Sequence, residues 1–119
     1  MSGSDMHELK AFRWMFLAAI VAGFAMPATA QDARKGEELA QQQCAACHGK
    51  DFVTPIDLTY PRLAGQYSDY LEKVLRDYRS GARKNPIMNG IAKPLTRDDI
   101  RNVAAYLSTL PGPLTNRKR

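Results

Sequence analysis

The chain has 119 residues, with 17 lysines and arginines against 12 aspartates and glutamates, and so carries a net charge of +5. This length allows one small domain and excludes a multi-domain enzyme. With only two cysteines, the chain is also not a disulfide-dense secreted scaffold.

The first 30 residues have the pattern of a secretory signal peptide. Lys10 and Arg13 precede Trp14–Met26, which is apolar apart from one glycine, and Ala28-Thr29-Ala30 has the small-x-small pattern of a cleavage site. The 13 apolar residues are fewer than the roughly 20 that span a membrane. We therefore expect export to the periplasm and a mature chain of residues 31–119. Nucleic acid is then a poor partner despite the positive charge, since the chain is exported and has no nucleic-acid-binding motif.

Two helices are predicted in the first part of the mature chain. Asp32 is a good N-cap for a helix from about Ala33 to Gln43. Gly36 inside it costs roughly 0.5–1 kcal/mol relative to alanine, so we expect another helix to cross closely there. A second helix is predicted from about Ser68 to Ser80, with Gly81 as its stop. Its predicted apolar face consists of Tyr70, Leu71, Val74, Leu75 and Tyr78.

A third helix has the clearest boundaries. Thr96–Asp99 fits a polar cap followed three residues later by an acid, and Pro111-Gly112-Pro113 ends the helix. Segments 49–66 and 82–95 are predicted to be loops, and 111–119 a basic, disordered tail. Residues 31–110 are therefore predicted to form an all-α domain with two unusually long loops. Such loops contribute little hydrophobic core, so we expect another group to fill the space between them.

The motif that carries chemistry is Cys44-Ala45-Ala46-Cys47-His48, the C-x-x-C-H of c-type haem attachment. Thiols one helical turn apart can each add to a vinyl group of the porphyrin, and the adjacent histidine then reaches the iron. A covalent haem c would also fill the space between the long loops and act as core and staple at once.

Other kinds of site share this spacing. A disulfide between Cys44 and Cys47 would close a loop too short to add much stability. A thioredoxin-like C-x-x-C opens a helix after a buried strand, whereas this one follows helical sequence. A zinc site needs four protein ligands, and the mature chain holds two cysteines and one histidine. Because that histidine is His48, none is left for a Ser-His-Asp hydrolase.

Met88 is the candidate for the second axial ligand, because it is the only methionine after residue 30. Histidine and methionine form a common axial pair of haem iron, and the thioether favours the ferrous state. The segment Asn85–Gly90 is predicted to be a loop that crosses the haem on the face opposite His48. The alternative is a methionine that fills a gap in the core.

Four segments together resemble the class I cytochromes c, especially small bacterial periplasmic members with one haem or two in tandem. The resemblance covers residues 33–110 and implies a class I cytochrome c fold, in which three main helices and loops wrap around one covalently attached haem. The matching segments are Cys44–Gly49, Pro61–Gln66, Asn85–Met88, and Leu95–Ile100 leading to Ala104–Leu107.

The resemblance also implies roles for particular residues. Cys44 and Cys47 would hold the haem, with His48 as the proximal and Met88 as the distal ligand of the iron. A loop carbonyl near Pro61 would accept the second N–H of the histidine.

Two packing contacts and one departure complete the resemblance. Leu63 would line the haem pocket, and Gly36 would pack against Ala105-Tyr106 where the terminal helices cross. Many relatives carry a glycine a few residues after the motif, whereas the segment Lys50–Thr54 has none.

With both axial positions filled, the iron has no open site for a small-molecule substrate. We therefore expect a one-electron carrier between redox partners of a respiratory or dehydrogenase chain, and not an enzyme. Five basic residues are predicted to dock on acidic patches of those partners, although they could equally form a solvated basic face. They are Arg76, Arg79, Arg83, Lys84 and Lys93.

Three other functions stay open. The chain could be a haem-bearing subunit of a larger oxidoreductase, and it would touch a membrane only through such a complex or an uncleaved leader. It could be a ligand-binding or peroxidase-type haem protein if Met88 does not bind the iron. It could also be a thiol-redox protein without haem.

Overall fold

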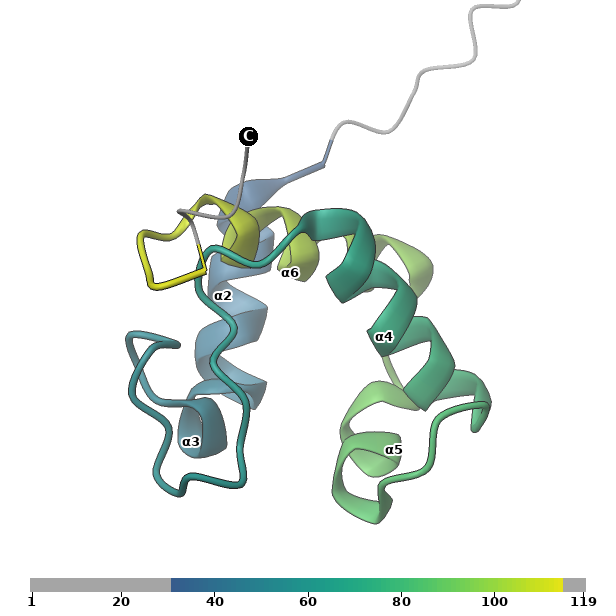
Figure 1. The fold of residues 1–119 in the computed structure, drawn as a ribbon. Helices are drawn as coiled ribbons and strands as arrows, with labels where there is room; N and C mark the ends of the chain where they lie inside the picture. The colour runs from purple at the N-terminus through teal and green to yellow at the C-terminus, as the bar shows by residue number, and fades with distance from the viewer. Residues whose placement is uncertain (1–30, 115–119) are drawn as a thin grey trace, which may run out of the picture. The chain divides into compact units, whose positions relative to one another are not determined.

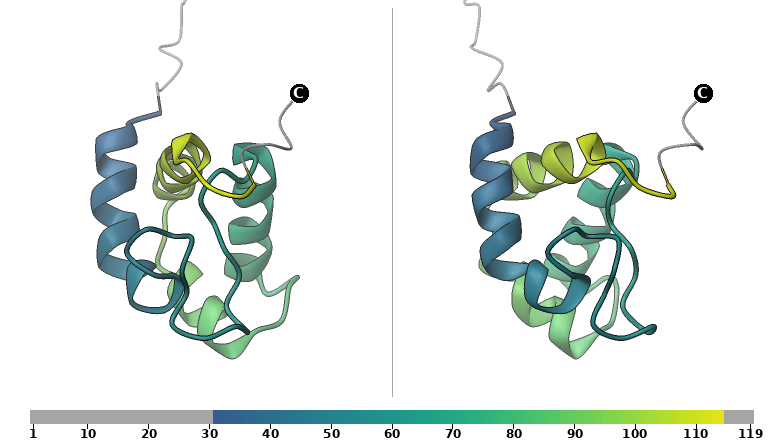
Figure 2. Two further views of the ribbon diagram at one scale, coloured as in Figure 1. Left: turned by 60° about the vertical axis from the view of Figure 1, so that its left-hand side comes forward. Right: turned by 90° about the vertical axis from the view of Figure 1, so that its left-hand side faces the viewer.

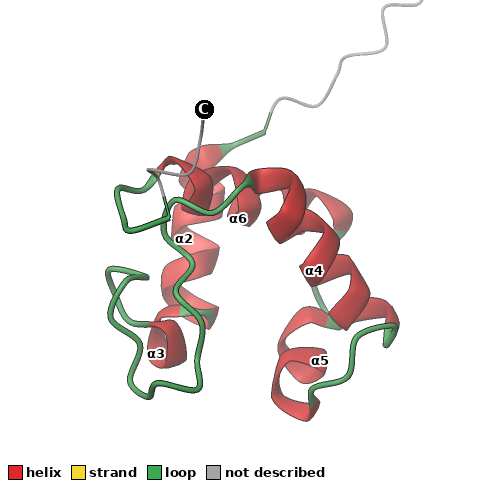
Figure 3. Cartoon of the chain, in the orientation of Figure 1, coloured by secondary structure: helices red, strands yellow, loops and turns green. Residues whose placement is uncertain are grey.

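The computed structural model describes residues 31–114, which consist of helices and loops, with no strand in that range (Figure 3). In chain order the helices are α2 (Ala33–Gln43), α3 (Ala45–His48), α4 (Ser68–Ser80), α5 (Pro86–Ala92) and α6 (Arg97–Thr109). The predicted signal peptide and the end of the predicted tail, residues 115–119, lie outside the described residues. Among the helices described here, none is both long and apolar enough to cross a membrane.

Helix α6 joins two arms of the described domain. It packs against α2, which continues into α3, and against α4, on which α5 packs. Figure 1 shows α3 and α5 on opposite sides below α6, and Figure 2 shows α6 crossing α2 near the start of α2. The fold therefore places the C-x-x-C-H motif on one arm and the Met88 segment on the other.

The three predicted helices are confirmed, and their caps form as the sequence indicates. The side chain of Asp32 accepts hydrogen bonds from the first turn of α2. Thr96 and Asp99 form a reciprocal capping box at the start of α6, with the Thr96 N–H donating to the Asp99 carboxylate at 2.8 Å. These bonds satisfy backbone N–H groups at the start of each helix, for which the helix itself offers no carbonyl acceptor.

Gly36 allows α2 and α6 to approach closely, as expected. A Cβ built on Gly36 would lie 2.0 Å from the backbone oxygen of Asn102 and 3.0 Å from Cβ of Tyr106. Gly36 thus faces Tyr106 as expected, but the atom nearest to it belongs to Asn102, a contact that was not predicted from the sequence. The N–H of Asp32 also donates to the side chain of Asn102 at 2.8 Å, which ties the start of α2 to α6.

The prediction that residues 82–95 form a loop is wrong, because α5 lies within them. The side chain of Asn85 accepts hydrogen bonds from the N–H groups of Ile87 and Met88 and so caps the helix. Pro86 takes the first helical position, where its missing N–H costs nothing and its fixed φ suits the helix. Met88 therefore lies in the first turn of a short helix and not in a loop.

The predicted apolar face of α4 is confirmed for most of its members. Leu71 and Leu75 are buried, and Val74 and Tyr78 are partly buried. Tyr70, in contrast, is 47% exposed. The core of the described domain is completed by residues of α2, α3, α6 and the loops: Ala40, Ala45, Phe52, Ala64, Leu95, Ile100, Val103, Ala104 and Leu107.

The loop after α3 is organised around Phe52, which is fully buried. Its φ of 56° lies in the left-handed region, so a phenylalanine takes the role that a glycine could fill in this glycine-free segment. The carbonyl oxygen of Phe52 accepts hydrogen bonds from Leu63 and Ala64, at 2.9 and 3.0 Å, and its ring meets Tyr106 edge-on. The loop is thereby folded back on the core.

The start of the predicted tail also contacts the domain. A Cβ built on Gly112 would lie 2.8 Å from the carbonyl oxygen of Ala64. Gly112 of the predicted tail therefore lies close against the loop that contains Ala64.

Candidate functional site

The C-x-x-C-H motif folds as a short helical turn at the end of α2. Cys44 lies at the junction of α2 and α3, and the N–H of His48 donates to the carbonyl of Cys44 at 3.0 Å. Cys44 and Cys47 are partly buried and carry free thiols. Side chains three residues apart in a helix lie on the same face, so both thiols are presented together.

The thiols do not have the character of a thiol-redox centre. Burial, and secondarily the charge of Cys47, raises the pKa of Cys44 to about 11. The thiol of Cys44 therefore stays protonated at neutral pH before any haem is attached. Thioredoxin-like motifs instead depend on a cysteine whose pKa is lowered, so the raised pKa of Cys44 argues against thiol–disulfide exchange.

His48 is buried and held in one orientation. Only 5% of its surface is exposed, and its ring meets that of Tyr60 edge-on, with the ring centres 6.0 Å apart. Its Nδ1 lies 2.8 Å from the carbonyl oxygen of Pro61, as expected. A carbonyl can only accept, so Nδ1 carries the proton and Nε2 keeps its lone pair for a metal. Leu63 is partly buried against the same core.

The loop between α3 and α4 is fastened to the motif. The N–H of Ile56 donates to the carbonyl of Cys47 at 3.2 Å. Together with the bond from His48 to Pro61, this contact keeps the loop beside α3 and so preserves the orientation of the imidazole.

Met88 is partly buried and packs against the hydrophobic core. Its backbone N–H donates to Asn85 Oδ1 at 3.0 Å, within the cap of α5. The side chain of the adjacent Asn89 donates to the carbonyls of Tyr78 in α4 and of Arg83 after it, and accepts from the N–H of Asn85, the cap of α5. The roles of Asn85 and Asn89 were not predicted from the sequence, although the dipeptide Asn85-Pro86 is a helix-start signal that indicates the first of them.

These residues suit a haem better than a bare metal ion. Among the described residues no group of three or more histidine, cysteine, aspartate or glutamate side chains could hold a metal. A porphyrin supplies four nitrogen ligands of its own, so the protein need contribute only two thiols for attachment and one or two axial ligands. A buried imidazole with a free Nε2, beside two thiols on one face, meets that requirement.

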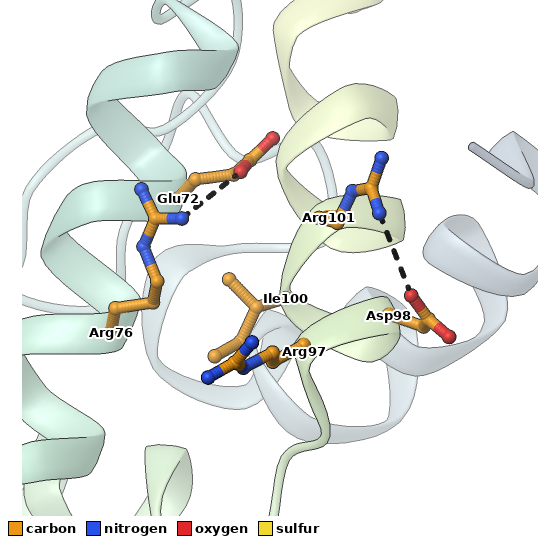
Figure 4. Close-up of a pocket in the computed structure, with 6 residues that line it drawn as sticks. All are labelled: Glu72, Arg76, Arg97, Asp98, Ile100 and Arg101. Atoms are coloured by element: carbon orange, nitrogen blue, oxygen red, sulfur yellow. Dashed lines mark ion pairs between the residues drawn. The ribbon is translucent and has the colours of Figure 1, made fainter. Parts of the chain in front are cut away.

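A separate groove lies between α4 and α6 and contains none of the predicted haem ligands. Figure 4 shows two ion pairs in it: Arg76 with Glu72 at 3.7 Å, and Arg101 with Asp98 at 3.8 Å. Arg76 is thus partly neutralised by its neighbour on α4. The lining residues are Glu72, Arg76, Arg97, Asp98, Ile100 and Arg101.

The other four predicted docking residues differ in their surroundings. Arg79 donates to a backbone carbonyl at 3.0 Å, and the guanidinium of Arg83 lies 5.1 Å from the ring centre of Tyr78. Lys84 and Lys93 are exposed on either side of α5, and within residues 31–114 neither forms an ion pair. Arg76 and Arg83 are exposed as well, so the two lysines differ from them in having no ion pair or ring contact among the described residues.

Comparisons with known proteins agree with this site. The model of the family described as Cytochrome c matches residues 33–111. The chain is 38% identical over 110 residues to a thiosulfate dehydrogenase electron acceptor of Stutzerimonas stutzeri, covering 88% of this chain and 51% of that protein. It is 41% identical over 85 residues to cytochrome c-554(548) of Halomonas halodenitrificans, covering 67% of this chain and 98% of that protein.

A solved structure shares the fold. Cytochrome c4 of Acidithiobacillus ferrooxidans is similar with a TM-score of 0.62 and 37% identity, over 66% of this chain and 49% of that one. The chain thus spans about half the length of this protein and of the thiosulfate dehydrogenase electron acceptor.

The helical fold and the motif on α3 define a c-type haem protein. The chain belongs to the cytochrome c family, with the class I fold of that family. It carries a covalently bound haem c with its iron, and Cys44 and Cys47 fit the attachment. The expected family, fold class and cofactor are therefore confirmed.

Proposed function

We propose that this chain is a periplasmic one-electron carrier whose haem iron is bound by His48 and Met88. The observation that carries the proposal is the buried His48 ring, whose Nδ1 donates to the Pro61 carbonyl and leaves Nε2 for the iron. The haem c, when bound, supplies an iron that alternates between the ferric and ferrous states.

The residues around the iron hold it without offering a place for a substrate. His48 would bind the iron through Nε2, while the hydrogen bond to the Pro61 carbonyl holds its ring in one orientation. Met88 on α5 would bind the iron with a soft thioether, which favours ferrous iron and so raises the reduction potential. With both side chains bound, the iron would have no coordination site left for water or a substrate.

The axial ligands are tested with the absorption spectrum and with Met88→Ala. The unaltered ferric protein should have the methionine–iron charge-transfer absorption. The variant should lose it, have a lower reduction potential, and bind carbon monoxide in the ferrous state. Ile87→Ala is the matched control, because Ile87 is the preceding residue of α5 and is 54% exposed. If the unaltered protein lacks the band, or if Met88→Ala leaves the potential and carbon monoxide binding unchanged, Met88 is not the ligand. An unaltered ferrous protein that itself binds carbon monoxide would favour a ligand-binding or peroxidase-type function.

The partners are proposed to be redox proteins. One relative is named an electron acceptor of thiosulfate dehydrogenase, which favours a periplasmic dehydrogenase as the electron donor here as well. The chain could also work as a haem-bearing subunit within such an enzyme. Purification of the exported protein under native conditions separates the two, because a free carrier elutes alone and a subunit elutes with its complex.

Export is proposed on the pattern of residues 1–30, with cleavage after Ala30. The mass of the haem-loaded protein from the periplasmic fraction tests it. A mature chain should begin at Gln31, whereas a protein retaining the leader would contradict the proposed cleavage.

A further inference from the structure

The side-chain amide of Asn89 joins α5 to the end of α4. Its Nδ2 donates to the carbonyl oxygen of Tyr78 at 2.6 Å and to that of Arg83 at 2.9 Å. Its Oδ1 accepts a hydrogen bond from the N–H of Asn85 at 2.9 Å. Both amide protons are therefore engaged, and both carbonyls belong to backbone outside α5.

Helix α5 has few other means of keeping its position. It has seven residues, which is too short for a helix to be stable alone in water, and only Ala92 among them is buried. Ile87 is 54% exposed and Met88 is only partly buried. The amide of Asn89 thus supplies a polar link to α4 at the residue next to Met88.

We propose that Asn89 is a positioning residue that holds the thioether of Met88 at the haem iron by fastening α5 to the end of α4. The inference rests on the proposed ligation of the iron by Met88. Because Asn89 directly follows Met88, the backbone that carries the thioether cannot move away without breaking the bonds to Tyr78 and Arg83.

Asn89→Asp tests the link with little change of shape. Aspartate keeps an oxygen that accepts from the N–H of Asn85, but it puts a second oxygen where Nδ2 faced two carbonyl oxygens. We expect the variant to bind iron through Met88 about tenfold or more weakly, since a donor to two carbonyls is lost. The ferric charge-transfer band should fall, the reduction potential should drop, and the ferrous protein should bind carbon monoxide while the haem stays attached.

Asn102→Asp is the matched control on α6. The Oδ1 of Asn102 accepts from the N–H of Asp32 at 2.8 Å, at the crossing of α2 and α6. This variant also replaces an amide by a carboxylate at a contact between elements, but it leaves α5 untouched. It should keep the charge-transfer band and the potential even if its melting temperature is lower.

Met88→Ala, measured in parallel, separates this inference from the proposed function. If Met88→Ala loses the band and Asn89→Asp keeps it, Met88 is the ligand and Asn89 does not position it. If the unaltered protein lacks the band, or if Met88→Ala leaves the potential and carbon monoxide binding unchanged, the proposed ligation fails and the role of Asn89 falls with it. If Asn102→Asp loses the band as fully as Asn89→Asp, the effect is general destabilisation and the inference is wrong.

The hydrogen bonds of Asn89 can also be tested in the unaltered ferrous protein, so that this test does not require any variant to fold. Proton exchange of the Asn89 side-chain amide, followed by NMR, should be much slower than that of Gln43, an exposed amide on α2. Equal exchange rates for the two amides would mean that the bonds to Tyr78 and Arg83 are not kept in solution, and the inference would be overturned.

Discussion

Phe52 combines a buried side chain with a backbone conformation that costs energy. Its ring is fully buried, while its φ of 56° disfavours a residue with a Cβ by roughly 1–2 kcal/mol. The carbonyl of the same residue accepts hydrogen bonds from Leu63 and Ala64, which lie two and three residues beyond the Pro61 that orients His48. Burial of the ring thus offsets the strain, and the carbonyl of Phe52 helps to place the loop that orients His48.

Glycine is usually less stabilising than alanine, but at Phe52 we expect the glycine variant to be at least as stable as the alanine variant. Phe52→Ala removes the buried ring and should cost about 3–5 kcal/mol of unfolding free energy. Phe52→Gly loses the same ring but relieves the strain, so it should be no less stable than Phe52→Ala. Urea unfolding of the haem-loaded protein measures both.

The same pair at Leu107, a buried residue inside α6, is the control. There glycine should be less stable than alanine by about 1 kcal/mol, because no positive φ favours it. An identical ranking at Phe52 and Leu107 would show that the loop is not strained in solution.

At the level of elements, the caps decide where the helices begin. The reciprocal bonds of Thr96 and Asp99 start α6, which packs against both α2 and α4. The hydrogen bonds from Thr96, the hydroxyl first and then the backbone N–H, lower the pKa of the Asp99 carboxyl. A carboxyl whose pKa is lowered by folding stabilises the fold above its unfolded pKa of about 3.9 and loses that effect as the pH falls through the folded pKa.

Thr96→Ala should therefore destabilise the protein by about 1 kcal/mol at neutral pH. The difference from the unaltered protein should begin to shrink as the pH falls below about 4, and should keep shrinking until the pH passes the lowered pKa of Asp99 in the folded protein. Thermal unfolding across this pH range measures it. Thr109→Ala, which loses a hydroxyl bonded to the carbonyl of Tyr106 at the other end of α6, should lack this pH dependence. A constant difference at all pH values would contradict the coupling to Asp99.

At the scale of the whole molecule, the net charge of +5 is unevenly available to a partner. Arg76, Arg79 and Arg83 each have an internal contact, with a carboxylate, a carbonyl and a ring respectively. Lys84 and Lys93 remain exposed on either side of the helix that carries Met88. This placement favours an acidic partner surface that approaches α5.

Reversing those two charges should slow electron transfer. Lys84→Glu with Lys93→Glu should lower the rate with the reductase several-fold at low ionic strength, with a difference that fades as salt screens the charges over about 10 Å at 0.1 M. Stopped-flow kinetics at rising ionic strength measures it. Lys50→Glu with Arg62→Glu gives the same change of net charge on exposed residues of the loop after α3. Equal slowing by both pairs would mean that net charge alone, and not the face around α5, steers the partner.

Local patterns in the sequence were enough to predict α2, α4 and α6, because caps and helical periodicity act within a few residues. The motif around Cys44, Cys47 and His48 was equally clear, since attachment chemistry demands that spacing. The segment around Met88 was misread as a loop, because Pro86 and Gly90 are loop signals in isolation. Only the cap from Asn85 and the packing on α4 make it a helix.

The sequence of this chain thus defines its class, its cofactor and the residues with the right donor atoms. Three features depend on contacts between distant segments: the Pro61 carbonyl that orients His48, the left-handed Phe52 that folds the loop back, and the amide of Asn89 that fastens α5 to α4. The hydrogen bond from His48 to Pro61 joins residues 13 positions apart, and the one from Asn89 to Tyr78 joins residues 11 positions apart. No local propensity encodes them, because the carbonyl partners are common to every residue and only the packed fold selects which one is in reach.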